Sequence, residues 1–283
     1  MINLPFEIDL KDKVAVVTGA GGVLCSLFAK AIARCGAKVA LLDLNLEAAA
    51  KFAADITAEG GTAKAYAANV LKKETLLEAR EQIRRDFGTC DILVNGAGGN
   101  NPRATTTNEY YLDGDMEKDI TTFFNLEPAG VEFVFNLNFL GTLIPTQVFA
   151  EDMLGKEDAS ILNVSSMNAY RPLTKIPAYS GAKAAVSNFT QWLAVHFAGA
   201  GIRVNAIAPG FLVSNQNKSL LFHEDGTPTA RTGKIMAGTP MKRFGQPEEL
   251  VGGVLFLLSK PAASFITGVV LPIDGGFNAY SGV

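Results

Sequence analysis

Residues 14–25 read VAVVTGAGGVLC, an apolar run that leads directly into a glycine-rich turn. The apolar run is typical of a buried strand, and the residues from Leu24 to Cys35 have the pattern of a helix that ends at Gly36. A strand, a glycine-rich turn and a helix in this order form a common phosphate-binding unit, because backbone N–H groups at the helix N-terminus attract anions. The stretch therefore predicts the first unit of a dinucleotide-binding fold.

Two positions in this turn depart from the usual glycine pattern. Gly19 permits the tight turn and is followed by Gly21 and Gly22, but Val23 and Cys25 stand where such loops often carry two more glycines. Phosphate binding needs backbone N–H groups rather than side chains, so the loop is still compatible with a nucleotide. A tight turn that binds no ligand is the alternative that the loop by itself leaves open.

The rest of the chain alternates strand-like and helix-like segments. Continuous apolar strands separated by amphipathic helices indicate a parallel sheet covered on both faces, and right-handed crossovers make it doubly wound. We therefore predict an α/β fold, a single Rossmann-type doubly wound domain over residues 1–283 with a seven-stranded parallel sheet flanked by helices. The predicted strands are Val14–Gly19, Lys38–Asp43, Ala63–Val70, Asp91–Gly98, Ala159–Ser166, Ile202–Gly210 and Gly268–Gly276, and the first helices are Leu24–Cys35, Leu46–Glu59 and Lys72–Phe87.

Two long polar stretches, residues 99–129 and residues 211–245, interrupt this alternation. Such excursions in an α/β domain are usually loops or small helices at the carboxyl ends of strands, where ligands bind. We expect both on the substrate side of the domain. The segment NEYYLDGD at residues 108–115 is predicted to pack as a lid or an edge.

Composition excludes several classes of protein. The 283 residues are 48% hydrophobic and 19% charged, which is typical of a soluble globular protein. A formal net charge of −3, with no run of Lys or Arg, argues against nucleic-acid binding. The N-terminus lacks the apolar core of a secretory signal, and no apolar run approaches the roughly 18 residues of a membrane helix. We expect a cytoplasmic protein that does not interact with membranes.

The cysteines and histidines offer no metal-binding pattern. Cys25, Cys35 and Cys90 lack CxxC spacing, so reduced thiols are expected, with Cys25 buried by packing. His196 and His223 lie far apart in the sequence, and we predict no metal site.

Asp43 supports nucleotide binding. It ends the second predicted strand, 24 residues after Gly19, where a carboxylate can accept hydrogen bonds from ribose hydroxyls. It would also repel a 2′-phosphate, which favours NAD over NADP. The alternative is an ordinary aspartate that caps the next helix, a role that Asn45 could take instead.

A second group of residues points to acid–base chemistry. Residues 179–183 read YSGAK, and positions four apart share one face of a helix, so the Tyr179 phenol and the Lys183 ammonium can lie side by side. A cation near a phenol lowers its pKa and makes it a better acid–base catalyst. Ser166 ends a predicted strand 13 residues upstream, and Asn138 lies in FNLNFLGT.

Taken together, these motifs resemble the short-chain dehydrogenase/reductase family over residues 10–276. They occur in the order typical of that family, with departures at Val23, Cys25, Asn69 and the NGAG motif, which stands in place of NNAG. The matching elements are the glycine turn, Asp43, Asn69 with Val70, Asn95–Gly98, Asn138, Ser166, YSGAK, Pro209 with Gly210, and the terminal DGG.

The resemblance implies an NAD-dependent oxidoreductase. Tyr179 would act as the acid–base, Ser166 would stabilise the carbonyl oxygen, Lys183 would hold the nicotinamide ribose and lower the tyrosine pKa, and Asn138 would anchor a proton-relay water. Cofactor contacts are implied for Gly19, Gly22, Leu24, Asp43, Asn69, Val70, Asn95, Ala97, Tyr179, Lys183 and Leu212. The family also implies a homotetramer, with the helix face of Phe189, Trp192 and His196 at an interface.

Four longer stretches resemble the D-mannonate oxidoreductases of this family: residues 93–106, 133–150, 165–198 and 274–283. This resemblance implies reduction of D-fructuronate to D-mannonate. A sugar acid needs a cation and several polar groups. Candidate substrate residues are Asn100, Arg103, Asn168, Arg171 and Lys175. A gluconate 5-dehydrogenase-like or other polyol oxidoreductase is the alternative with the same fold. A catalytically silent, NAD-sensing protein is the alternative from another class, although it would be expected to lack Tyr179, Ser166 or Lys183.

Overall fold

The computed structural model describes residues 8–213 and 221–282. Its centre is a seven-stranded sheet in the order β3-β2-β1-β4-β5-β6-β7, and every pair of neighbours is parallel. The break in the order between β1 and β4 is the switch point of a doubly wound sheet, as predicted. The strands are β1 Val14–Thr18, β2 Lys38–Asp43, β3 Thr62–Ala67, β4 Ile92–Asn95, β5 Ala159–Val164, β6 Ile202–Pro209 and β7 Val270–Ile273.

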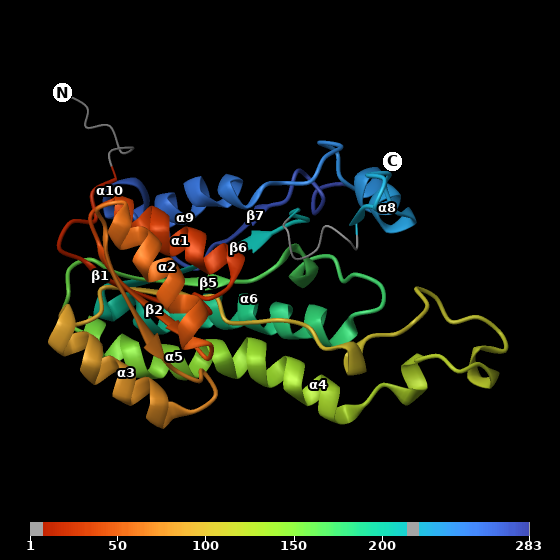
Figure 1. Cartoon of the computed structure of the whole chain (residues 1–283), viewed down its shortest axis with the longest axis horizontal. Helices are drawn as coiled ribbons and strands as arrows, with labels where there is room; N and C mark the ends of the chain where they lie inside the picture. The colour runs from red at the N-terminus through yellow and green to blue at the C-terminus, as the bar shows by residue number, and fades with distance from the viewer. Residues whose placement is uncertain (1–7, 214–220, 283) are drawn as a thin grey trace.

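Helices cover both faces of this sheet (Figure 1). On one face the apolar sides of α1, α2 and α9 form a core with the strands, through residues such as Phe28, Ile56 and Leu257. On the other face α3, α5 and α6 do the same, through residues such as Leu76, Phe149 and Leu193. These helices span Val23–Arg34, Leu46–Ala58 and Val251–Leu258 on the first face, and Lys73–Asp86, Gly141–Phe149 and Pro177–Phe197 on the second.

All seven predicted strands are present, but most end earlier than predicted. β4 stops at Asn95, for example, although the prediction extended to Gly98. The glycine-containing ends of these segments leave the sheet and become the loops that form the site. The three predicted helices begin and end within one residue of the observed ones. Asn45 caps α2 by accepting a hydrogen bond from Ala48 N at 3.1 Å, so the capping role that was the alternative for Asp43 belongs to Asn45.

One helical stretch runs without interruption from Pro128 to Met153, and by length and composition alone it could cross a membrane. The sequence shows no continuous apolar run in this helix, because polar residues are scattered along its length. Half of its most apolar window is buried inside the protein, so it is a core helix. It comprises α4 (Pro128–Phe135), a π-helical turn η4 (Asn136–Leu140), α5 and the 3₁₀ turn η5 (Ala150–Met153).

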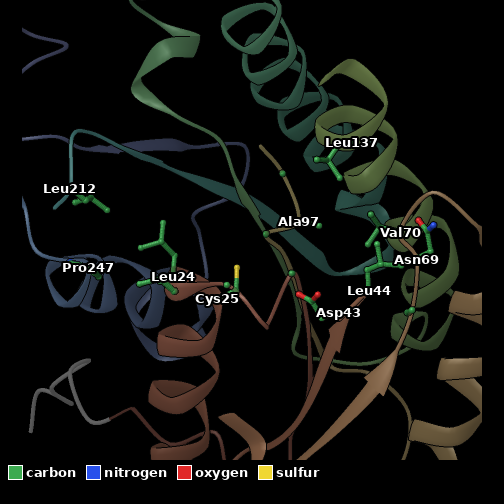
Figure 2. A pocket seen from close by; sticks show the side chains of 16 residues that line it. Leu24, Cys25, Asp43, Leu44, Asn69, Val70, Ala97, Leu137, Leu212 and Pro247 are labelled. Carbon is green, nitrogen blue, oxygen red and sulfur yellow. The ribbon is translucent and has the colours of Figure 1, made fainter. Parts of the chain in front are cut away.

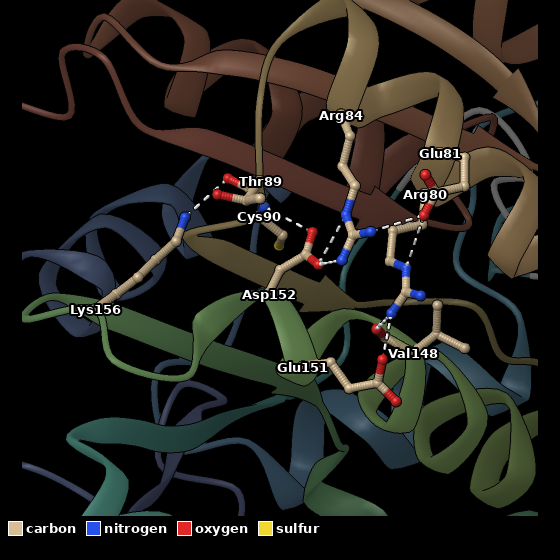
Figure 3. Close-up of polar contacts among 9 residues, drawn as sticks. All are labelled: Arg80, Glu81, Arg84, Thr89, Cys90, Val148, Glu151, Asp152 and Lys156. Atoms are coloured by element: carbon tan, nitrogen blue, oxygen red, sulfur yellow. Dashed lines mark hydrogen bonds and ion pairs between the residues drawn. The ribbon is translucent and has the colours of Figure 1, made fainter.

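A buried carboxylate joins this long helix to α3 and to the start of β4. Asp152 accepts a hydrogen bond from Arg84 Nε at 3.1 Å and another from the backbone N–H of Cys90 at 3.1 Å (Figure 3). Arg80, one turn earlier on α3, donates to the carbonyl of Val148 at 2.8 Å and pairs with Glu151 at 2.6 Å. These bonds fix the amino-terminal side of the sheet and leave the carboxyl ends of its strands free for a site.

The two polar excursions contain loops and short helices, as predicted. Residues 99–129, called the arm below, extend away from the sheet beyond the start of α4 and contain three 3₁₀ turns (Figure 1): η1 Pro102–Ala104, η2 Asp115–Glu117 and η3 Phe123–Asn125. The buried Asp115 holds the outer part of the arm together through Asn108, Leu112 N and Lys118. The second excursion contains α8, Ala230–Gly238. The segment at 108–115 lies on the exposed edge of the arm.

Candidate active site

A cavity of about 520 Å³ lies at the carboxyl ends of β1, β2 and β4. Figure 2 shows Leu24, Cys25, Leu212 and Pro247 on one side of it, and Asn69, Val70 and Leu137 on the other. Eight residues predicted to contact a cofactor line this cavity: Gly19, Gly22, Leu24, Asp43, Asn69, Val70, Ala97 and Leu212. Sequence reasoning missed Leu44, Ala68, Leu137 and Pro247, which carry no motif and reach the cavity through the fold alone.

Glycine is required at the start of the turn. Gly19 has φ +67°, and a Cβ there would lie 2.9 Å from the backbone N and Cα of Ala97. The absence of a side chain lets the loops after β1 and β4 meet at the cavity wall. Gly22 N then donates to Gly19 O at 3.0 Å, which closes the turn just before α1 begins at Val23.

Asp43 connects β2 to the same turn. Its Oδ2 accepts a hydrogen bond from Gly21 N at 2.9 Å, and its Oδ1 accepts one from Asn45 N at 2.8 Å. A Cβ at Gly21 would lie 3.0 Å from this carboxyl group, which explains the second glycine of the turn. The carboxylate lies at the edge of the cavity, where its remaining acceptor positions can meet a pair of hydroxyl groups.

Two of the four departures in the motifs, Cys25 and the Gly96 of NGAG, lie side by side. A Cβ built at Gly96 would lie 2.0 Å from Cys25 Sγ, so the thiol fills the space that a side chain at position 96 would need. Cys25 is 4% exposed, and burial raises the pKa of its thiol to about 12, which keeps it neutral. The prediction that Cys25 is buried by packing is confirmed, and none of the three cysteines forms a disulfide.

The residues expected to perform acid–base chemistry meet next to this cavity. Lys183 is buried and donates from Nζ to the carbonyl of Val164 at 2.8 Å. The same Nζ lies 5.7 Å from the centroid of the Tyr179 ring, on the shared helix face that the spacing predicts. Ser166, at the end of the loop after β5, has a side-chain hydrogen bond with the Tyr179 phenol.

The pKa of Tyr179 is raised, whereas the spacing of Tyr179 and Lys183 predicted that it would be lowered. Burial raises the pKa of the Tyr179 phenol, and the hydrogen bond with Ser166 opposes that shift. The expected lowering by Lys183 is not a cause of the shift, because its ammonium is directed at Val164 O rather than at the phenol oxygen. Burial also lowers the pKa of Lys183 to about 8, and Cys25 acts in the opposite direction.

The buried ammonium predicts a specific dependence of stability on pH. Lys183 has a pKa of about 8 in the folded protein against 10.5 unperturbed, so between these values the unfolded chain binds more protons. The contribution of Lys183 to the free energy of unfolding is therefore lowest below pH 8 and increases as the pH rises toward 10.5. Compared with Lys183→Met, the free energy of unfolding of the wild type should therefore rise by about 3 kcal/mol across this interval. Urea titrations of both proteins, analysed as a difference, measure it. If the difference in free energy of unfolding between the two proteins stayed constant from pH 8 to 10.5, the pKa of Lys183 would not be lowered by burial.

Asn138 holds the loop after β4 against the long helix. It lies in the π-helical turn η4 and is fully buried. Its Nδ2 donates to Gly99 O at 2.7 Å and to Val134 O at 2.8 Å, while its Oδ1 accepts from Gly99 N at 3.2 Å. A Cβ at Gly98 would lie 2.6 Å from this Oδ1 and 3.1 Å from Lys183 Nζ. Gly98, in the cavity wall, therefore brings Asn138 and Lys183 together.

Asn95, expected among the cofactor contacts through its backbone, does not line the cavity. Its side chain is 2% exposed and turns into the protein, where Nδ2 donates to Thr146 Oγ1 and to Asn163 Oδ1, both at 2.9 Å. Asn163 continues this network to Thr190 on α6 at 2.9 Å. Asn95 therefore joins β4, β5, α5 and the helix that carries Tyr179.

Among the residues that the structure describes, no hydrogen bond or ion pair joins the five predicted substrate residues to one another. Arg103 is exposed and pairs with Glu127 at 3.4 Å, and Asn100 donates to Thr105 within the arm at 3.0 Å. Arg171 is exposed. Asn168 is 5% exposed, and its Oδ1 has no hydrogen-bond partner among the described residues. Lys175 is half-buried, with a left-handed backbone of φ +72°.

The histidines lie away from the cavity. His196 stacks on Trp192 with ring centroids 4.7 Å apart, and Phe189 continues the stack, as the helical spacing predicts. His223 is exposed. Over residues 8–213 and 221–282, no three side chains of His, Cys, Asp or Glu gather as a metal site.

Comparison with known proteins identifies the family. The family model described as enoyl-(acyl carrier protein) reductase matches residues 24–278. An uncharacterised oxidoreductase of Haemophilus influenzae is 62% identical over 282 residues, which cover 100% of this chain and 99% of that protein. The chain belongs to the short-chain dehydrogenase/reductase family.

Other family members agree with this result. An uncharacterised oxidoreductase of Bacillus subtilis is 50% identical over 99% of this chain and 100% of that protein. A crystal structure from Haemophilus influenzae, provisionally described as a D-mannonate oxidoreductase, contains bound NAD. It superimposes with a TM-score of 0.95 at 62% identity and covers 99% of this chain and 100% of that protein. The short-chain dehydrogenase/reductase fold predicted from the motifs is therefore confirmed.

Proposed function

We propose that this protein is an NAD(H)-dependent oxidoreductase that interconverts a ketone and a secondary alcohol on a sugar acid. The observation that carries the proposal is the contact between the two halves of the site. Gly98 lines the nucleotide cavity, and the position of its missing Cβ lies 3.1 Å from Lys183 Nζ, which in turn lies beside Tyr179. This contact supports a role for Tyr179 next to a nucleotide bound in the cavity.

The residues of the cavity fit NAD. Gly19 and Gly96 let the glycine turn, Cys25 and the β4 loop pack closely at the cavity wall, and α1 begins at this turn, where the free backbone N–H groups of a helix N-terminus favour phosphate. Asp43 is suited to ribose hydroxyls and would repel a 2′-phosphate. The related structure that holds NAD supports this choice. When bound, NADH supplies the hydride for the reduction.

Side chains of the protein donate the proton and stabilise the negative charge that develops on the substrate oxygen. We assign Tyr179 as the group that donates a proton to the substrate oxygen, and Ser166 as the hydroxyl that donates a hydrogen bond to the same oxygen. Lys183, whose Nζ lies beside the Tyr179 ring, holds the cofactor ribose. Asn138 fixes the loop beside Lys183 and anchors the water through which the proton is replaced.

We assign the substrate pair as D-fructuronate and D-mannonate. The similarity to the Haemophilus influenzae protein provisionally described as a D-mannonate oxidoreductase supports this assignment, as do the cations Lys175 and Arg171 in the segment before α6. A gluconate 5-dehydrogenase-like activity is the runner-up, because it uses the same chemistry on another six-carbon acid.

A substrate panel tests the assignment. Purified protein with NADH is expected to reduce D-fructuronate with a kcat/KM at least about tenfold above that for 5-keto-D-gluconate or for a neutral ketose. A tenfold preference corresponds to about 1.4 kcal/mol in the transition state. Turnover of 5-keto-D-gluconate in preference to D-fructuronate would establish the runner-up. Tight NADH binding without turnover of any substrate would instead favour the NAD-sensing alternative.

We also propose that the protein is a cytoplasmic homotetramer. An apolar groove of about 500 Å³ runs between α5 and α6, next to the exposed Trp192. Apolar surface of this kind is favourable to bury between subunits. Light scattering of the purified protein measures the oligomeric state.

A further inference from the structure

Three segments that are distant in the sequence are in contact: the arm, the loop that leads into α6, which carries Tyr179, and α8. The arm contributes Glu109, the loop before α6 contributes Lys175, and α8 contributes Arg231 and Lys234. Two contacts hold them together. Thr106 N donates to Lys175 O at 2.9 Å, and Lys234 Nζ pairs with Glu109 Oε2 at 2.6 Å.

The geometry of α8 directs two cations at the arm. Arg231 and Lys234 are three residues apart and share one face of the helix. Because Lys234 contacts Glu109, that face is turned toward the arm. The positive charges of Lys234, Lys175 and Arg231 all lower the pKa of the Glu109 carboxyl, which places all three cations within electrostatic reach of it. Lys234 is thus paired with the Glu109 carboxylate, and Lys175 and Arg231 lie near enough to act on it electrostatically.

The backbone of Lys175 supports a role for this cluster. A left-handed φ of +72° is uncommon for a residue other than glycine, and such conformations concentrate at functional sites. Lys175 precedes Tyr179 by four residues, so their α-carbons are at most about 14 Å apart. Among the residues that the structure describes, the side chains of Lys175 and Arg231 have no hydrogen bond or ion pair. Both can therefore bind a further anion.

We propose that Lys175, Arg231 and Lys234 form an anion subsite that recognises the carboxylate of the substrate, with Glu109 holding the subsite together when no substrate is bound. The inference rests on the proposed function, and it assigns specificity for acids over neutral sugars to α8 and the arm. Guanidinium and ammonium groups that converge on one point bind a carboxylate through charge-assisted hydrogen bonds.

Binding measured without turnover tests the subsite. D-gluconate, a hexonate probe, and neutral D-mannitol are titrated calorimetrically into the protein saturated with NADH. Arg231→Gln and Lys175→Met are each expected to weaken D-gluconate binding about tenfold or more, and to leave D-mannitol binding within twofold. Glu109→Gln removes the competing negative charge and should strengthen D-gluconate binding a few-fold. Lys11→Met, at the other end of the sheet, removes one surface charge as the control and should change neither.

The outcomes separate this subsite from the proposed function. Weaker D-gluconate binding in the cation variants supports the subsite, even if D-fructuronate is not turned over, in which case only the substrate assignment fails. Equal D-gluconate binding by the wild type, Arg231→Gln and Lys175→Met would overturn the subsite, even in an active enzyme. Weaker D-gluconate binding by Glu109→Gln would also overturn the subsite, because removal of a negative charge should strengthen the binding of an anion.

Discussion

Tyr179→Phe is expected to lower kcat for ketone reduction by about a thousandfold and to leave the dissociation constant for NADH within about twofold. Removing a positioned general acid typically costs between about 10² and 10⁴ in rate. The phenol oxygen is hydrogen-bonded to Ser166, while the ring lies beside Lys183, so a phenylalanine ring retains the ring packing and loses the hydroxyl group that would donate the proton. Steady-state rates and NADH fluorescence titrations measure the two quantities.

Tyr170→Phe is the matched control for this substitution. Tyr170 lies on the loop between Ser166 and α6, and its hydroxyl donates to Val270 O at 2.7 Å rather than to the site. Losing that bond should cost about 1 kcal/mol of stability and change kcat less than threefold. If Tyr170→Phe lost as much activity as Tyr179→Phe, or if Tyr179→Phe remained active, Tyr179 would not be the proton donor.

Gly96→Asn is expected to destabilise the protein by about 3 kcal/mol and to abolish measurable NADH binding. The added Cβ would lie 2.0 Å from Cys25 Sγ, in a core where overpacking typically costs about 1–3 kcal/mol. The displaced thiol lies at the start of α1, so the phosphate-binding turn must move with it. Chemical denaturation and NADH titration of the variant measure both effects.

A second substitution, at position 25, gives a sharper test of the contact between Cys25 and Gly96. In the double variant Cys25→Gly/Gly96→Asn, the space left by the thiol accepts the asparagine, so stability and NADH binding should return to near the wild-type values. The coupling energy between the two positions is expected to be about 2 kcal/mol or more. Gly252→Asn is the control, because a Cβ at that position meets no atom within 4 Å. Additive effects at positions 25 and 96 would contradict the packing described here.

The strands of the fold could be predicted because the parallel sheet is buried on both faces. Sequences such as VAVV and the VALL of KVALLD are continuously apolar, and β1 is buried at all five positions. Strand ends were harder to predict, since residues such as Gly96–Gly98 continue the pattern of the strand but leave its hydrogen-bond ladder. The direction in which they turn depends on contacts from other segments, such as Asn138 and Lys183.

The site was predictable only where a residue type and its spacing carry the chemistry. The YSGAK spacing places Tyr179 and Lys183 on one face, and Asp43 ends β2 at the cavity. The sequence showed Cys25 only as a departure from the usual glycine pattern, because Gly96, the residue that makes room for its thiol, is 71 positions away. The cluster of Lys175, Arg231 and Lys234 was missed for the same reason, since only the packing of the arm against α8 assembles it.

The most direct test of the central claim is the initial rate of NADH oxidation with D-fructuronate, recorded for the wild type and Tyr179→Phe in parallel. We predict rapid oxidation by the wild type that falls about a thousandfold in the variant, with NADH bound equally by both. Absence of oxidation by a wild-type protein that binds NADH would contradict the hexuronate assignment. An equal rate in the variant would contradict the catalytic role of Tyr179.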